Sequence, residues 1–261
     1  MKDIFLVCIF SLVTVLDLSA QENTLLKLCY NKPANQRVEA LPIGNGRLGA
    51  MVFGNLSQEK IQLNENTVWA DQPNRNDNPE AKEALPQVKK LIFKGRYKEA
   101  QDLVNQKFIS KISQGMPYQT VGNLYLSFPG QENFINYYRE LNIETAVTSI
   151  RYEVERVTFK REVFATFPDQ IIILRITANK PGEINFTASM NRPTPVEVST
   201  HGNDQLIMSG VTGDCDAVKG AIQFRAQLKI ETEGGSISPT DSSLRVKDAN
   251  SATLYINRLI F

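Results

Sequence analysis

The sequence IRYEVERVTFKREV, residues 150–163, alternates apolar and polar side chains in two successive runs. Apolar residues occupy every second position from Ile150 to Val154, and Val157, Phe159 and Val163 form the apolar series of the second run. This period of two is typical of β-strands that pack on one face and meet water on the other. Residues 150–163 therefore predict two consecutive strands of a half-exposed sheet.

Similar runs continue to the end of the chain. The run Ile171–Leu174 is short and continuously apolar, which fits a strand buried on both faces. Turn-forming residues, such as Lys180-Pro181-Gly182 and Gly234-Gly235, separate the runs. Many short strands at this spacing predict a mainly β fold, a large antiparallel β-sandwich or supersandwich. The remaining runs are Ile184–Ala188, Leu206–Val211, Ala221–Ile230, Leu244–Val246 and Ala252–Ile256.

The segment from about 78 to 108 has a different period. Asn78 and Pro79 supply an N-cap and a proline at the first helical position. Apolar residues then recur at helical spacing until Gly95 interrupts the pattern, which resumes beyond it. Pro86 falls inside the pattern, and we expect it within the first turns, where its missing N–H matters least. We therefore predict a helical hairpin inserted between the strands.

The N-terminus has the pattern of an export signal. Lys2 precedes an apolar run from Ile4 to Leu16, and small residues close the run at Ser19-Ala20. This arrangement is typical of a secretory signal peptide cleaved after Ala20, and a buried N-terminal helix or strand is the alternative. We expect residues 1–20 to be removed and residues 21–261 to form one domain that is exported to the periplasm or the extracellular space.

Composition and charge exclude several classes of function. The chain has 261 residues, with 29 Lys and Arg against 28 Asp and Glu, and a formal net charge of +1. This balance argues against nucleic acid or a membrane surface as a partner. The one histidine, His201, excludes a multi-histidine zinc site, and its neighbours Gly202-Asn203 place it in a solvated turn. We expect no metal and no cofactor.

The cysteines do not form a disulfide framework. Cys8 leaves with the signal, so Cys29 and Cys215 remain, far apart in the sequence. A single bridge in an oxidising compartment and two buried free thiols are the alternatives, and we expect the buried thiols.

Residues 44–49, GNGRLG, match the G-x-G-x-x-G spacing of dinucleotide-binding loops. That function requires a strand before the glycines and a helix after them. Here Pro42 precedes the glycines, and the apolar run Ala50–Phe53 is closed by a turn at Gly54-Asn55. The segment therefore predicts two strands joined by a tight turn that the glycines permit, and not a cofactor loop.

The segment NENTVWAD, residues 64–71, places the only tryptophan beside amides and acids. Sugars bind by stacking on an aromatic ring, with hydrogen bonds from amides and carboxylates to their hydroxyl groups. The alternative is a half-buried Trp69 that closes the sandwich while Asn64 and Asn66 cap turns. Composition alone favours this structural interpretation.

Several segments form an ordered series along the chain. They are LPIGNGRLGAMVFG (41–54), IQLNENTVW (61–69), Asn78-Pro79, Gly95-Arg96-Tyr97, Tyr118-Gln119, GNLYL (122–126), YREL (138–141), REVFA (161–165) and PDQ (168–170). In this order they resemble the N-terminal domain of glycoside hydrolase family 95, the inverting α-L-fucosidases and their relatives. The likeness runs from about Leu25 to about Ile256, with Asn66, Asn123 and Asn142 where such proteins usually carry Asp.

The resemblance implies a β-sandwich domain of an exported α-L-fucosidase, an enzyme that hydrolyses terminal α-linked fucose by single displacement. In the family, an (α/α)6 barrel follows the sandwich and holds the catalytic acid and the residues that activate water. Here Asn257–Phe261 follows the last predicted strand, SATLYI (251–256). The resemblance therefore implies that the catalytic barrel is missing, through engineering or through a truncated or frameshifted reading frame, and that the fragment is inactive alone.

The resemblance also implies partners. The barrel of the same enzyme and a fucosylated glycan are the expected partners, and Asn64, Glu65 and Trp69 become a hypothetical loop facing barrel or substrate. No catalytic residue carries over. The alternatives are a stand-alone carbohydrate-binding module that uses Trp69 and an interaction domain for a separately encoded barrel. Another deoxy- or galacto-sugar stays open as the target of the parent enzyme.

Overall fold

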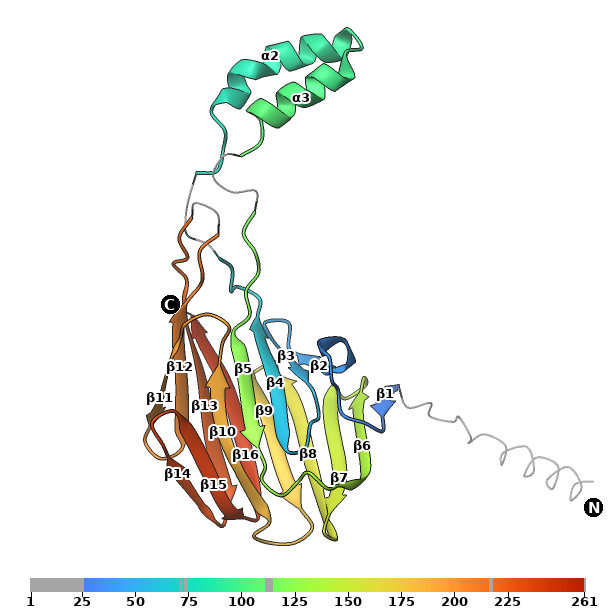
Figure 1. The fold of residues 1–261 in the computed structure, drawn as a ribbon, viewed down its shortest axis with the longest axis vertical. Coiled ribbons are helices and arrows are strands. Elements are labelled where there is room, and N and C mark those ends of the chain that lie inside the picture. Colours follow the sequence, from blue (N-terminus) through green and yellow to red (C-terminus); the bar gives the residue numbers. More distant parts are fainter. Residues whose placement is uncertain (1–25, 71, 73–74, 111–114, 216–217, 261) are drawn as a thin grey trace, which may run out of the picture.

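The computed structural model describes residues 26–260 apart from 71, 73–74, 111–114 and 216–217, so the signal sequence expected at residues 1–20 lies outside the described residues. Two antiparallel sheets face each other across one apolar core (Figure 1). This arrangement confirms the predicted antiparallel β-sandwich.

The larger sheet has nine strands in the described chain. In spatial order they are β1 (Lys27–Tyr30), β6 (Ile135–Asn142), β7 (Val147–Val154), β8 (Val157–Thr166), β9 (Ile171–Ala178), β16 (Ser251–Ile260), β13 (Gln223–Glu233), β12 (Gln205–Val211) and β11 (Glu197–His201). The smaller sheet has seven, namely β14 (Ser236–Pro239), β15 (Ser243–Ala249), β10 (Ile184–Asn191), β5 (Gly122–Ser127), β4 (Gln58–Glu65), β3 (Leu48–Val52) and β2 (Leu41–Gly44). A short 3-10 helix, Arg37–Glu39, precedes β2.

The apolar series of the sequence forms the core between the sheets. Val157, Phe159 and Val163 of β8 are buried, as their period of two predicts. β9 departs from the prediction of burial on both faces, because Ile172 and Leu174 are buried whereas Ile171 and Ile173 are only half-buried. The outer face of β9 is thus partly open, as is usual for an antiparallel sheet.

The glycine-rich segment joins β2 to β3, as predicted. Gly46 has a φ of +89°, a conformation that favours glycine, and the Asn45 side chain accepts hydrogen bonds from the backbone N–H groups of Arg47 (3.1 Å) and Leu48 (2.8 Å). β3 then pairs with β2, so a strand follows the glycines where a dinucleotide site would need a helix.

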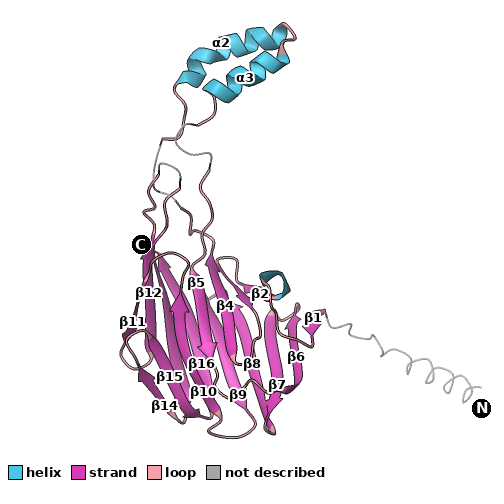
Figure 2. Cartoon of the chain, viewed as in Figure 1, coloured by secondary structure: helices cyan, strands magenta, loops and turns pink. Residues whose placement is uncertain are grey.

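Two helices, α2 (Glu80–Phe93) and α3 (Tyr97–Lys107), form a hairpin that stands away from the sandwich (Figure 2). The Asn78 side chain accepts a hydrogen bond from the N–H of Glu80 (3.0 Å) and so caps the first turn. Pro86 lies in the middle of α2 and not in its first turns, at an exposed position. Neither helix of the described chain is long and apolar enough to cross a membrane.

Both cysteines of the described chain are free thiols, but the expectation that they are buried is wrong. Cys29 is exposed on β1, and Cys215 is half-buried. β1 is an edge strand that pairs only with β6 and has no strand on its other side. All four of its residues are therefore exposed.

Candidate functional site

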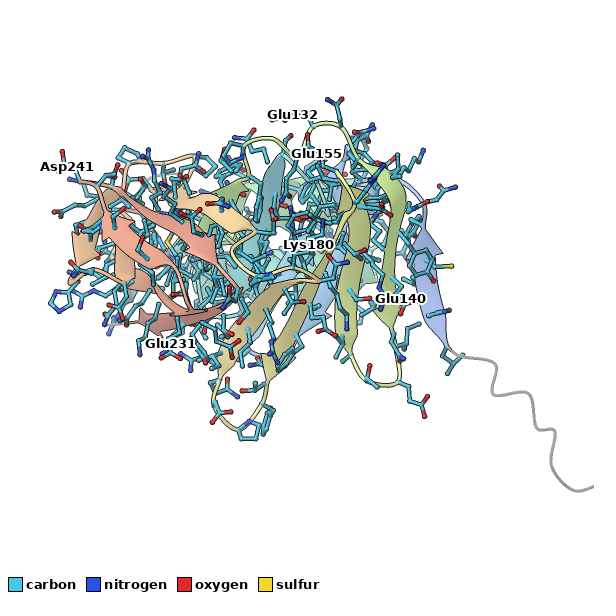
Figure 3. The ribbon with its side chains drawn as sticks, turned by 90° about the horizontal axis from the view of Figure 1, so that it is seen from below. Glu132, Glu140, Glu155, Lys180, Glu231 and Asp241 are labelled. Carbon is cyan, nitrogen blue, oxygen red and sulfur yellow. The ribbon has the colours of Figure 1, made fainter. Side chains whose placement is uncertain are left out.

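The candidate loop, residues 64–69, lies at the end of the sandwich from which the helical hairpin projects. β4 runs toward this end (Figure 1). Asn64 and Glu65 are its last two residues, and Trp69 follows after a turn. β16 also ends here. At the opposite end, seen in Figure 3, Glu132, Glu155 and Lys180 are exposed on turns between strands.

Glu65 is buried, and its carboxylate contacts both its own loop and the neighbouring β2–β3 turn. One carboxylate oxygen accepts hydrogen bonds from the backbone N–H (2.7 Å) and the hydroxyl (2.8 Å) of Thr67, and the other forms an ion pair with Nε of Arg47 (3.2 Å). These contacts close the turn after β4 and tie it to the β2–β3 turn. The structure therefore gives Glu65 the role of holding the loop in place and does not present it to a sugar.

Trp69 is 43% exposed and forms an aromatic pair with Tyr118, which is also 43% exposed. The ring centroids lie 5.3 Å apart with an interplanar angle of 67°, an edge-to-face contact. Trp69 Nε1 donates to the carbonyl of Asn66 (2.9 Å), and the Tyr118 hydroxyl donates to the carbonyl of Glu65 (2.7 Å). The pair offers a rigid, half-exposed aromatic surface of the kind that stacks on a sugar or packs against protein.

Asn64 does not join this surface. It lies on the opposite face of β4 from Glu65, because successive residues of a strand point to opposite faces. Asn64 also borders a small cavity of about 10 Å³ between the sheets, together with Asn257 and apolar core residues of both sheets. A space of this size holds about one water molecule, so it is no sugar site.

Tyr118 was not predicted as a site residue from the sequence. Hydrogen bonds from Arg192 and Gly213 hold the segment that carries it. The Gln119 side-chain oxygen accepts from Arg192 Nη2 (2.8 Å) and from the N–H of Gly213 (2.9 Å). Arg192 also donates to the carbonyl of Thr120 (3.0 Å), and its guanidinium lies 4.5 Å from the centre of the Phe224 ring. These contacts fix the 118–120 segment to the larger sheet.

A second exposed aromatic residue, Phe167, belongs to the same end of the sandwich. It lies in the β8–β9 turn and is exposed. The turn is linked to the β2–β3 turn by a hydrogen bond from the Asn45 side chain to the carbonyl of Thr166 (2.7 Å). The rim of this end is thus built from three connected loops. The sequence predicted a candidate sugar- or barrel-facing site in only one of them, the loop after β4.

Three groups whose pKa values are raised by burial lie in the core and not at this rim. Burial raises the pKa of Glu59, Tyr137 and Tyr152 above their ordinary values. Glu59 of the smaller sheet forms a fully buried ion pair with Arg161 of the larger sheet (3.2 Å). Arg161 also donates to the Tyr152 hydroxyl (2.7 Å), and the Tyr137 hydroxyl donates to the carbonyl of Gly54 (2.8 Å), so the cluster is a structural link between the sheets.

The described residues bring together no group of three His, Cys, Asp or Glu side chains that could hold a metal ion. His201 is exposed at the end of β11, where the sequence predicted a solvated turn. The aromatic pair at the rim is therefore the strongest candidate site in the described part of the chain.

Comparison with known families defines the class of protein. The family described as "Glycosyl hydrolase family 65, N-terminal domain" matches residues 28–258. This match covers nearly all of the sandwich and its hairpin. The chain belongs to this family of N-terminal domains of glycosyl hydrolases.

The chain is also similar to proteins that are named as α-fucosidases. The chain is 39% identical over 192 residues to "Alpha-L-fucosidase 2" of Arabidopsis thaliana, an alignment that covers 71% of this chain and 22% of the plant protein. It is 29% identical over 173 residues to the protein named "Probable alpha-fucosidase A" of Aspergillus niger, with 63% of this chain and 21% of the fungal protein covered. The matched region spans about a fifth of the length of these relatives.

Proposed function

We propose that this chain is the non-catalytic N-terminal β-sandwich domain of an exported α-L-fucosidase of family 95. The observation that carries the proposal is the 39% identity to the Arabidopsis enzyme over 192 residues. The intact enzyme would hydrolyse terminal α-linked fucose from glycans. A carboxylic acid would protonate the leaving oxygen while a base-activated water attacks the opposite face of the sugar.

The burial and the contacts of Glu65 support a non-catalytic role for the sandwich. Single displacement needs two carboxyl groups about 6.5–9.5 Å apart, one to donate a proton and one to activate water. Glu65, the acid of the candidate loop, is buried and bonded to Thr67 and Arg47. A carboxylate held in this way has no access to a glycosidic oxygen or to an attacking water.

The aromatic pair supports a role at the junction with the rest of the enzyme. Trp69 and Tyr118 are half-exposed at the end of the sandwich where β16 ends (Figure 1). In the proposed enzyme, this rim faces the catalytic barrel or the bound glycan. The apolar run Ile4–Leu16 supports export, and N-terminal sequencing of the secreted protein is expected to begin at Gln21.

A graft experiment tests the proposal. Residues 28–258 replace the corresponding domain of the Arabidopsis α-L-fucosidase, and fucose release from a fucosylated oligosaccharide is measured for the graft and for the 261-residue chain alone. We expect activity from the graft and none from the chain. Fucose release by the highly purified chain alone, or an inactive graft that is nevertheless folded, would contradict the proposal.

The second candidate function is a carbohydrate-binding module, which the half-exposed Trp69–Tyr118 pair favours. Trp69 is the only tryptophan, so intrinsic fluorescence reports on this surface alone. Titration of the chain with fucosylated oligosaccharides should change the emission if the pair binds sugar. A flat titration of the chain leaves the junction role.

A further inference from the structure

The helical hairpin leaves an apolar surface without a partner in the described chain. Within the two helices, only Val88 of α2 and Ala100 of α3 are buried. Phe93 is 88% exposed and Tyr97 is 69% exposed, and both lie at the tip of the hairpin. Exposed aromatic residues at the tip of a projecting element are unusual unless another surface covers them.

The apolar residues continue along one side of α2. Leu85 and Ile92 are exposed and seven residues apart, so they lie on the same side of the helix, two turns from each other. Helices of 14 and 11 residues are marginal on their own and depend on packing of their apolar sides. We define the docking surface as Leu85, Ile92, Phe93 and Tyr97.

The hairpin also carries a positive charge. Residues 80–107 contain seven Lys or Arg and four Asp or Glu, a net charge of +3. Five of the basic residues surround the tip, namely Lys89, Lys90, Lys94, Arg96 and Lys98, and Arg96 is paired with Glu99. A second copy of the hairpin would repel this surface, whereas a surface of net negative charge would attract it.

We infer that the docking surface packs against an apolar, net-acidic surface in the remainder of the same enzyme. The inference rests on the proposed function, and it deepens that function by naming the surface that makes the contact. The matched region spans about a fifth of the α-L-fucosidase relatives, which leaves most of their length to supply the partner. The hairpin and the end of β16 lie at the same end of the sandwich (Figure 1), so a following domain can reach the hairpin.

The test uses the graft of residues 28–258 in the Arabidopsis enzyme. Ile92→Ser and Phe93→Ser remove apolar contacts of the docking surface, and Gln87→Ser is the matched control. Gln87 is exposed and lies roughly 140–200° around α2 from Leu85 and Ile92, at about 100° per residue. We expect the first two variants to lower the Tm of the graft by several degrees and its fucosidase activity about tenfold or more, with the control unchanged.

The same substitutions in the 261-residue chain provide the second comparison. There the side chains are exposed, so all three variants should keep the Tm of the parent chain. If the docking-surface variants behave like Gln87→Ser in the active graft, the inference is wrong. An inactive but folded graft counts against the proposed function instead.

Hydrogen exchange of the 261-residue chain tests the inference without the graft. If the hairpin lacks its partner, its amides should exchange much faster than those of β4 and β8, because local unfolding costs little there. Fast exchange supports the inference. Protection of α2 and α3 equal to that of the core strands would overturn the inference, because the hairpin would then be stable without a partner.

Discussion

Replacing Arg161 by methionine removes a guanidinium that joins the two sheets inside the core. Its Nη atoms donate to the carbonyls of Asn55 (2.7 Å) and Leu56 (2.8 Å), to the Glu59 carboxylate (3.2 Å) and to the Tyr152 hydroxyl (2.7 Å). The guanidinium carbon lies 3.8 Å from the centre of the Phe128 ring, and the side chain is fully buried. Methionine retains the apolar stem and loses every donor.

The expected loss of unfolding free energy follows from the Glu59 carboxylate, which stays buried after the substitution. Glu59 loses its counter-charge and keeps only the backbone N–H groups of Gly54 (2.8 Å) and Lys60 (3.1 Å). Removing one partner of a buried ion pair costs about 3–5 kcal/mol of unfolding free energy. For a chain of this size, that is a fall in Tm of roughly 6–20 °C.

The loss should depend on pH. Burial already raises the pKa of Glu59 above 4.5, and loss of Arg161 removes the largest opposing effect. The folded variant would then bind a proton that the unfolded chain has released. Its stability therefore falls as pH rises above about 4.5, and its deficit relative to the parent shrinks as pH is lowered toward that value.

Urea unfolding followed by far-ultraviolet circular dichroism measures these effects. The matched variant is the double substitution Glu59→Leu with Arg161→Met, which removes both charges and should recover part of the lost free energy. A cost below about 1 kcal/mol for Arg161→Met, the value of an exposed pair, would refute the reasoning. So would a double variant no more stable than the single one.

Three further outcomes follow from the structure. Tyr118→Phe loses the 2.7 Å hydrogen bond to a β4 carbonyl and should cost about 0.5–1.5 kcal/mol in urea unfolding. Gly122→Ala should cost about 1–3 kcal/mol or more, because its φ is +142° and an added Cβ would lie 2.5 Å from the Asn191 carbonyl oxygen; a parent-like midpoint would contradict this. In a chain that begins at Gln21, Cys29 should react with a thiol reagent faster than Cys215, and equal rates would contradict their difference in exposure.

The strands of the larger sheet were predictable because their alternation is strong. β8 shows both the strength and the limit of this pattern. Val157, Phe159 and Val163 indicate the buried face, and position 161 shares that face by period two. A charged residue there conflicts with the pattern, and only the partner Glu59, 102 residues earlier in the chain, explains it.

The candidate loop was only partly predictable. The alternation Ile61, Leu63, Glu65 continues onto the buried face of β4, so the burial of Glu65 was accessible from the sequence. Tyr118 was not, because its contact with Trp69 joins segments 49 residues apart across the hairpin insertion. No local pattern encodes a contact of that range. That the loop of Asn64, Glu65 and Trp69 faces a barrel or a substrate stays a prediction.

The base of the hairpin insertion has a consequence for how the domain can vary. The N–H of Ala70 donates to the carbonyl of Pro117 (3.0 Å), and the N–H of Gln119 donates to the carbonyl of Val68 (2.8 Å). The chain thus leaves and re-enters the sandwich at adjacent points that are already clamped together. A short turn between Ala70 and Pro117 would close that gap, so the insertion can change in length while the sheets stay as they are.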